Sequence, residues 1–224
     1  MSLRTNIATL KARIPEGVVL VAVSKTKSVE LIREAYEAGQ RDFGENYVQE
    51  LLIKQSQLPH DIRWHFIGHL QSNKVKQIVP FVHLIHGIDS VKLLKEVNKQ
   101  AEKAGRMVSC LLQIHIAREE SKFGFSYEEC RAFLDSQEWK SMKQLNVCGF
   151  MAMASNTDNE DELRKEYAGL GEFFDHERIK HPELSILSCG MSGDYALAIE
   201  SGSTMIRVGS ALFGERDYQT KAGT

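Results

Sequence analysis

The sequence predicts one α/β domain, spanning residues 1–224, folded as a (β/α)8 TIM barrel. Three observations lead to this prediction. Segments typical of strands and helices alternate along the whole chain with short connections. Eight such strand–helix units follow one another without a break, which favours a closed barrel over an open sheet. The length of 224 residues suits one domain of this kind without elaborate insertions. An open, doubly wound sheet is the alternative.

The first half of the chain contains four of the predicted units. Residues 18–24 form an apolar, β-branched run without polar alternation, as expected of a strand covered on both faces. A helix follows it, with Ser28 as N-cap and Gly39 as its stop. The further strands are expected at 42–44, 63–67 and 82–86. Their helices are expected at 46–57, 74–79 and 90–104, the last with regular apolar spacing and a glycine, Gly105, at its end.

The second half repeats the pattern. Strands are expected at 107–116, 145–153, 184–188 and 205–208. Helices are expected at 127–136 and 195–201, the latter stopped by Gly202. A long helix with apolar residues from Leu163 to Phe174 precedes the seventh strand, and a last helix begins near Ser210.

The composition narrows the range of possible functions and partners. The formal net charge of −2 gives no electrostatic reason to expect a nucleic acid or an anionic membrane as partner. The four cysteines lie far apart without a CxxC or CxxH pair, so we expect buried free thiols in a reducing compartment. Residues 1–14 lack the apolar stretch of a secretory signal, and no segment approaches transmembrane length. The sequence therefore predicts a cytoplasmic protein.

Several histidines are candidate metal ligands. His83 and His86 are three residues apart, so on a strand they point to opposite faces, and no third ligand is near in sequence. His65 and His115 are flanked by apolar residues and are expected to be hydrogen-bonded histidines of the core or the barrel lining. No metal site is predicted.

A lysine follows the first strand, at the end where α/β folds place their chemistry. A lysine amine in an apolar pocket loses proton affinity, which frees its lone pair for attack on a carbonyl and formation of a Schiff base. Two lysines, Lys25 and Lys27, occupy this position, and strand alternation does not choose between them. The alternative is a solvated lysine at a strand end.

The segments after the seventh and eighth strands have the composition of a phosphate site. In this architecture those loops commonly bind phosphate, through backbone N–H groups at helix starts. Small residues permit close approach and hydroxyls can donate hydrogen bonds. The residues are Ser188, Gly190, Ser192, Gly193, Gly209 and Ser210. The alternative is ordinary turn chemistry.

Arg207 lies inside the apolar run 205–208 and needs a partner, because a buried unpaired charge is costly. The partner is either an acid on a neighbouring strand or a ligand atom. An amine nucleophile, a phosphate anchor and an arginine facing a ring nitrogen together describe a pyridoxal 5′-phosphate site.

Four segments, 22–27, 43–50, 64–71 and 207–214, resemble the pyridoxal phosphate homeostasis proteins, as do 121–124 and 149–151. The resemblance covers nearly the whole chain in the same order. It implies a fold-type III barrel like the amino-terminal domain of bacterial alanine racemase, with the cofactor aldehyde held as a Schiff base on Lys25.

The resemblance also implies roles for further residues. Ser188, Ser192, Gly209 and Ser210 would hold the phosphate, and Arg207 would face the pyridine nitrogen. Asn46 and Met151 would line the ring, and His69 would close the same face. A permanently charged arginine cannot accept a proton from the ring nitrogen, so the cofactor would be a weaker electron sink than beside an aspartate.

The function implied is that of a carrier or buffer of pyridoxal 5′-phosphate, not an enzyme. Racemases of this type take a second base from an appended β-domain of the partner subunit, and the chain ends about ten residues after Gly214, so we expect that domain to be absent. A monomer would then suffice, with apo forms of pyridoxal phosphate-dependent enzymes as acceptors. The alternatives are a racemase-like enzyme and a cofactor-free Schiff-base aldolase acting on a phosphosugar.

Overall fold

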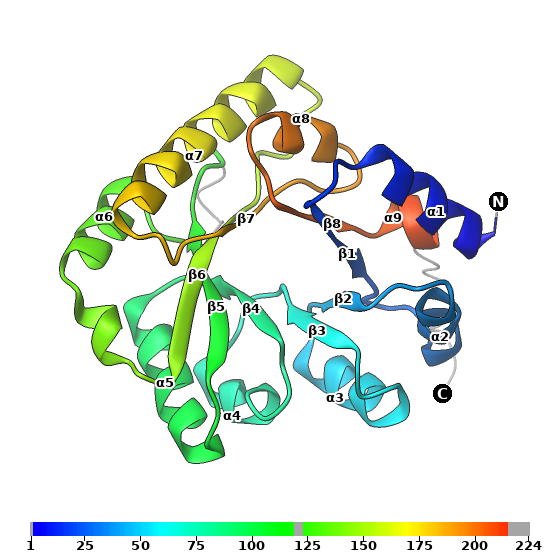
Figure 1. Cartoon of the computed structure of the whole chain (residues 1–224), viewed down its shortest axis with the longest axis horizontal. Coiled ribbons are helices and arrows are strands. Elements are labelled where there is room, and N and C mark those ends of the chain that lie inside the picture. The colour runs from blue at the N-terminus through cyan, green and yellow to red at the C-terminus, as the bar shows by residue number, and fades with distance from the viewer. Residues whose placement is uncertain (1, 119–122, 215–224) are drawn as a thin grey trace.

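The computed structural model describes residues 2–118 and 123–214, and its eight parallel strands close into a barrel (Figure 1). The strands are β1 (Val19–Val23), β2 (Asp42–Glu45), β3 (Arg63–Phe66), β4 (Leu84–Ile88), β5 (Val108–Ile114), β6 (Leu145–Ala152), β7 (Ile186–Ser188) and β8 (Met205–Val208). Strand β8 closes the barrel on β1, with Val19 opposite Met205 and Ala22 opposite Val208. The barrel prediction is therefore confirmed, and the open sheet is wrong.

The helices surround the barrel on its outside (Figure 1). They are α1 (Leu3–Arg13), α2 (Val29–Glu37), α3 (Val48–Gln57), α4 (Val75–Ile78), α5 (Val91–Ala104), α6 (Tyr127–Asp135), α7 (Glu160–Lys180), α8 (Tyr195–Glu200) and α9 (Ser210–Phe213), with 3-10 turns at Ser72–Lys74 and Glu138–Ser141. The predicted caps are present. The Ser28 hydroxyl accepts a hydrogen bond from the Leu31 amide at 3.3 Å, and Gly105 ends α5 in the left-handed region at φ 63°.

Several elements differ from the prediction; strand β7, for example, begins at Ile186 instead of 184, and β5 ends at Ile114 instead of 116. Helix α1 was not predicted, although Leu3, Ile7 and Leu10 form a buried stripe at helical spacing and Ser2 caps the helix. Strand β4 begins two residues later than predicted, at Leu84 instead of 82. The apolar residues before it, such as Val82, are fully buried in the core beneath the helices, so their hydrophobicity does not mark the strand itself.

Apolar side chains fill two separate regions. The larger lies between the barrel and its helices, and the smaller lies inside the barrel, where alternate residues of each strand point inward. The smaller group comprises Val21, Leu84, Leu111, Cys148, Met151 and Met205. Buried polar side chains from β2, β3, β4, β7 and β8 occupy the rest of the interior: Asp42, His65, His86, Ser188 and Arg207.

All four cysteines are free and buried, as the sequence predicts. Burial raises the pKa of each thiol, which keeps these groups protonated and unreactive. Within the described part of the chain, no helix has the length and apolarity that crossing a bilayer requires. Residues 121 and 122 of one motif that carried the resemblance lie outside the described residues.

Candidate functional site at the carboxyl end of the barrel

A cavity of about 360 Å³ opens at the carboxyl end of the barrel, between the segments that follow β1, β2, β7 and β8. This size suits a small organic ligand. Most of the predicted site residues line it, namely Lys25, Asn46, Ser192, Arg207, Gly209 and Ser210, together with Lys27. Residues near the two ends of the chain, such as Lys25 and Arg207, therefore meet here because barrel closure brings β1 beside β8.

Lys25 lies on a tight turn just beyond β1. The Lys27 amide donates to the Ser24 carbonyl at 3.0 Å, and Thr26 has a φ of 65°, which is unusual for a residue other than glycine. Such a conformation costs about 1 kcal/mol or more and persists only when its surroundings hold it. The turn directs the segment carrying Lys25 toward the cavity.

Two side chains of α3 hold this turn. Lys54 is only 3% exposed, and its Nζ donates to the Ser24 carbonyl at 2.7 Å. On the other side of Lys25, the Thr26 amide donates to Glu50 at 2.6 Å. The peptide groups on both sides of Lys25 are thus anchored to one helix.

The anchor is part of a buried ionic cluster. Lys54 also contacts Glu45 at 2.8 Å and Glu50 at 2.7 Å, and the Ser24 hydroxyl donates to Glu45 at 2.5 Å. Burial raises the pKa of Glu45 to about 6, although Lys54 and the hydrogen bonds oppose the shift. Sequence reasoning missed this cluster, because the spacing of Glu50 and Lys54 is also typical of a solvated helix pair.

The two lysines of the motif have different surroundings. The Nζ of Lys27 lies 3.3 Å from the Phe213 carbonyl and 3.4 Å from that of Gly214. Lys27 therefore interacts with the carboxyl end of α9, where a cation is favourable. Both lysines line the cavity, but only Lys25 has both neighbouring peptide groups held by α3.

Arg207 is 4% exposed and reaches the cavity from β8. One guanidinium nitrogen donates to the carbonyl and hydroxyl oxygens of Ser188, both at 2.7 Å, and another donates to the Ala152 carbonyl at 2.8 Å. Burial lowers the pKa of Arg207, yet an arginine stays charged in proteins. Among the described residues no carboxylate pairs with it, so the salt-bridge alternative is wrong and the charge is held by the neutral acceptors of Ser188 and Ala152 below the cavity.

The loops after β7 and β8 meet beside Arg207. The Gly209 amide donates to the Ser192 hydroxyl at 3.3 Å, which joins the two loops. Gly190 has a φ of 91°, and a Cβ there would lie 2.7 Å from that of Ala198, so only glycine fits this bend. Ser192, Gly209 and Ser210 all border the cavity and offer hydroxyl and amide donors of the kind that bind phosphate oxygens.

Three predicted site residues lie elsewhere. Ser188 is fully buried below the cavity, where it contacts Arg207. Met151 is 1% exposed and packs inside the barrel. His69 lines an adjacent cavity of about 290 Å³ that also includes Asn46. The His69 Nδ1 lies 3.0 Å from Asp89.

Met153, two residues after Met151, is the methionine that lines the cavity. Sequence reasoning missed it, although the period of two along a strand places both residues on the same face, with Met153 one layer closer to the carboxyl end. That alternation is the signal that could have found it.

Asn46 supplies the clearest sign that the cavity is built for a ligand. Its Oδ1 is buried without a hydrogen-bond partner among the described residues, a costly state that a bound donor would relieve. Its backbone is held closely, because a Cβ on Gly68 would lie 2.3 Å from the Asn46 carbonyl oxygen. An unpaired acceptor, a buried cation and a group of anion donors fit a phosphorylated ring.

The fold and these side chains define a ligand-binding (β/α)8 barrel of the alanine racemase N-terminal domain class. The family model described as "Alanine racemase, N-terminal domain" matches residues 1–217. The pyridoxal phosphate homeostasis protein of Vibrio alginolyticus is 39% identical over 211 residues, covering 92% of this chain and 90% of the relative. That of Pseudomonas aeruginosa is 37% identical over 228 residues, with 97% of each chain covered. The chain belongs to the pyridoxal phosphate homeostasis protein family.

Solved structures agree. PipY of Synechococcus elongatus PCC7942, solved with pyridoxal phosphate bound, matches with a TM-score of 0.86 and 36% identity over 95% of this chain and 100% of that chain. An alanine racemase of Clostridium difficile 630 matches with a TM-score of 0.80 over 97% of this chain but only 57% of its own length. Its identity of 14% shows a likeness of fold alone.

Proposed function

We propose that this protein binds pyridoxal 5′-phosphate in the cavity at the carboxyl end of the barrel and serves as a cytoplasmic carrier or buffer of the cofactor. The observation that carries the proposal is the convergence of Lys25, Arg207 and the Ser192–Gly209 pair on one cavity. The bound PipY structure and the names of the relatives support it. Bound there, the cofactor would supply an aldehyde for reversible attachment to an amine.

Each side chain has a role in this proposal. The Lys25 amine bonds to the aldehyde carbon as a Schiff base, and the carbonyl oxygen leaves as water. Arg207 presents a fixed cation to the ring nitrogen. Ser192, Gly209 and Ser210 bind the phosphate, with Ser188 supporting Arg207 from below. Asn46 and Met153 line the ring, and Met151 packs beneath Met153.

His69 has a role at the rim of the site, farther from the cavity than the other residues. It stacks on Phe123 with ring centroids 4.4 Å apart and borders the neighbouring cavity beside Asn46. We place it at the rim of the site, where it covers the side of the ring that Asn46 contacts.

A carrier must bind tightly enough to hold the aldehyde and still release it. The proposed acceptors are apo forms of pyridoxal phosphate-dependent enzymes, and the protein acts as a monomer. Neutral donors at the phosphate and a reversible bond to Lys25 suit exchange. A buried arginine at the ring nitrogen disfavours the protonated ring and makes the cofactor a weaker electron sink, which suits a carrier; racemases of this type compensate for it with two opposed bases.

The test combines loading, transfer and turnover. The purified protein is incubated with pyridoxal 5′-phosphate and passed through a desalting column. We expect a visible absorption band that is absent in Lys25→Ala, and transfer of the cofactor to an added apoenzyme. Absence of the band in the wild type would overturn the proposal, and it would favour the aldolase alternative. Racemisation or α-deuterium exchange of single-enantiomer amino acids by the loaded protein would replace the carrier with an enzyme.

A further inference from the structure

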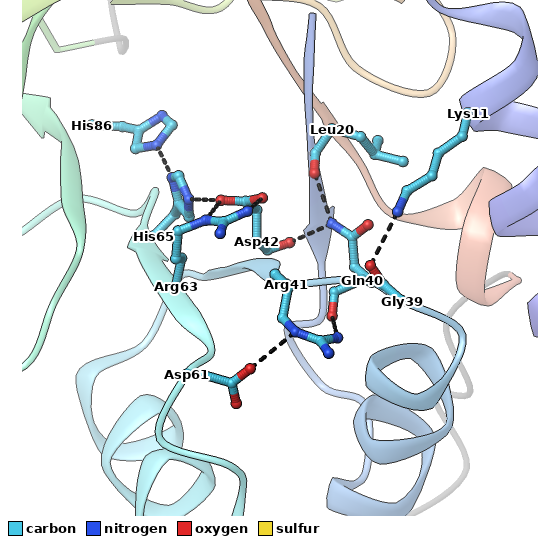
Figure 2. A network of polar contacts seen from close by, with 10 residues as sticks. All are labelled: Lys11, Leu20, Gly39, Gln40, Arg41, Asp42, Asp61, Arg63, His65 and His86. Carbon is cyan, nitrogen blue, oxygen red and sulfur yellow. Dashed lines mark hydrogen bonds and ion pairs between the residues drawn. The ribbon is translucent and has the colours of Figure 1, made fainter.

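Five buried side chains form one hydrogen-bonded chain through the barrel interior. It starts at Asp42, where Arg63 donates to the carboxylate at 2.7 and 2.5 Å. His65 Nε2 lies 3.0 Å from Asp42, and His65 Nδ1 lies 2.9 Å from His86 Nε2. Figure 2 shows this part, with the His65 ring between Asp42 and the His86 ring.

The chain continues to the ligand cavity. His86 Nδ1 lies 3.0 Å from the Ser188 hydroxyl, which in turn lies 2.7 Å from the Arg207 guanidinium. His65, His86 and Ser188 are fully buried, so water does not replace any of these contacts. The chain thus connects the amino-terminal end of β2 with the cation at the carboxyl end of β8.

The chemistry at the two ends, together with the neutral state of the two imidazoles, determines the direction of every bond. Arg207 can only donate, and an ionised Asp42 can only accept. Burial opposes ionisation of Asp42, but hydrogen bonds from Arg63 and His65 hold its pKa well below the usual range. With both imidazoles neutral, Ser188 accepts from Arg207 and donates to His86, which donates to His65, which donates to Asp42. Each imidazole then carries one proton, on Nε2.

The electrostatics agree with neutral imidazoles. Burial lowers the pKa of His65, although Asp42 opposes the shift. Burial lowers the pKa of His86 further, with added repulsion from His65 and Arg207. The exposed ring of His83 lies beside His65, with centroids 5.4 Å apart, but no hydrogen bond joins it to the chain.

We propose that Asp42, His65 and His86 are positioning residues that hold the Ser188 hydroxyl as an acceptor and thereby fix the orientation of the Arg207 guanidinium in the cavity from the opposite end of the barrel. A rotatable hydroxyl would otherwise choose between donor and acceptor roles. Because the Ser188 hydroxyl donates its hydrogen bond to His86 Nδ1, the lone pairs of the Ser188 oxygen stay directed toward Arg207. The consequence for cofactor binding rests on the proposed function; the chain itself does not.

The first experiment observes the chain in ligand-free protein. Ring nitrogen shifts of His65 and His86 are measured by ¹⁵N NMR at pH 7, together with solvent exchange of the Arg207 guanidinium protons. We expect neutral rings protonated at Nε2 and slow exchange at Arg207. A doubly protonated ring, or a proton on Nδ1 of either histidine, would overturn the proposal.

Substitutions then test the positioning role. His86→Phe keeps a planar, somewhat larger ring and removes both hydrogen bonds, so Arg207 exchange should accelerate about tenfold or more. His83→Phe is the matched control and should change nothing at Arg207. His86→Asn can retain an acceptor near Ser188 and should show a smaller effect, which keeps the test valid if the phenylalanine variant fails to fold. Unchanged exchange in both His86 variants would refute the role.

Titration with pyridoxal 5′-phosphate separates this inference from the proposed function. His86→Phe should weaken binding about tenfold and shift the absorption maximum, whereas His83→Phe should do neither. If the wild type does not bind the cofactor, the proposed function fails while the NMR measurements still decide the chain. If the wild type binds and folded His86→Phe binds identically, the positioning role fails and the proposed function stands.

Discussion

The Lys54 Nζ lies 2.7 Å from the Ser24 carbonyl oxygen, directly before Lys25 in the chain. Glu50, one helical turn earlier on α3, accepts from the Thr26 amide directly after it. The backbone of the proposed ligand-bearing lysine is therefore held on both sides by one helix. This explains how a residue beyond the end of β1, in a turn with a left-handed Thr26, has a defined position at the cavity.

Removing the contacts of Lys54 should lower the free energy of unfolding. Lys54→Met leaves the buried Glu45 without its cationic partner, and we expect a loss of about 3–5 kcal/mol in the free energy of unfolding, measured by denaturant titration. Adding Glu45→Gln should recover part of the loss. Lys11→Met is the control, because Lys11 donates to a neutral group, the Gly39 carbonyl at 3.2 Å, at an exposed position. A change below 1 kcal/mol for Lys54→Met would show that the cluster does not stabilise the turn.

For cofactor affinity, the shape and hydrogen bonds of the Arg207 guanidinium should matter more than its positive charge alone. Arg207→Lys keeps a cation but cannot reach Ser188 and Ala152 together, so cofactor affinity should fall about 10- to 100-fold and the absorption maximum should shift. Arg106→Lys is the control, because Arg106 also donates to two carbonyls, those of Val79 and Val82, far from the cavity. Equal affinities for Arg207→Lys and wild type would remove Arg207 from the binding site.

The bend after β7 requires a glycine. At Gly190 an alanine would combine a φ of 91° with a Cβ 2.7 Å from Ala198, so Gly190→Ala should destabilise the fold by about 1–3 kcal/mol and weaken phosphate binding. Gly193→Ala lies in the same loop with no atom within 4 Å of the added Cβ and should be neutral within about 0.5 kcal/mol. Thermal unfolding of both variants decides; similar melting temperatures would contradict this account.

Glu45 should make stability depend on pH. Burial raises its folded pKa to about 6, above its unfolded value near 4.5, so the folded state binds the extra proton. The stabilisation from this proton is complete below pH 4.5 and is lost as pH rises through 6. Relative to Glu45→Gln, the wild type should therefore lose about 2 kcal/mol between pH 4.5 and 7. Parallel stability profiles of the two proteins would show that the folded pKa is not raised.

The sequence predicted the barrel well because its signals are local. The apolar run of β1, the Ser28 cap and the Gly105 stop each determine an element without distant contacts. Closure of the barrel was predicted from the eight successive strand–helix units. The first helix was missed because its stripe of Leu3, Ile7 and Leu10 is short and separated by polar residues.

The site was predictable only in part, for a physical reason. Motif loops such as 207–210 contain the residues that line the cavity, so the motifs indicate them directly. The supporting side chains cannot be identified in this way. Lys54 and His86 lie on other elements, and their role depends on barrel closure, which brings each to a partner that is distant in sequence.

The most direct test of the central claim is chemical mapping of the attached lysine. The protein is loaded with pyridoxal 5′-phosphate, reduced with borohydride to make the bond permanent, and digested for peptide mass spectrometry. This account predicts a stoichiometric modification on Lys25, with Lys27 unmodified. Modification at Lys27, or a scatter of partial labels over surface lysines, would contradict it.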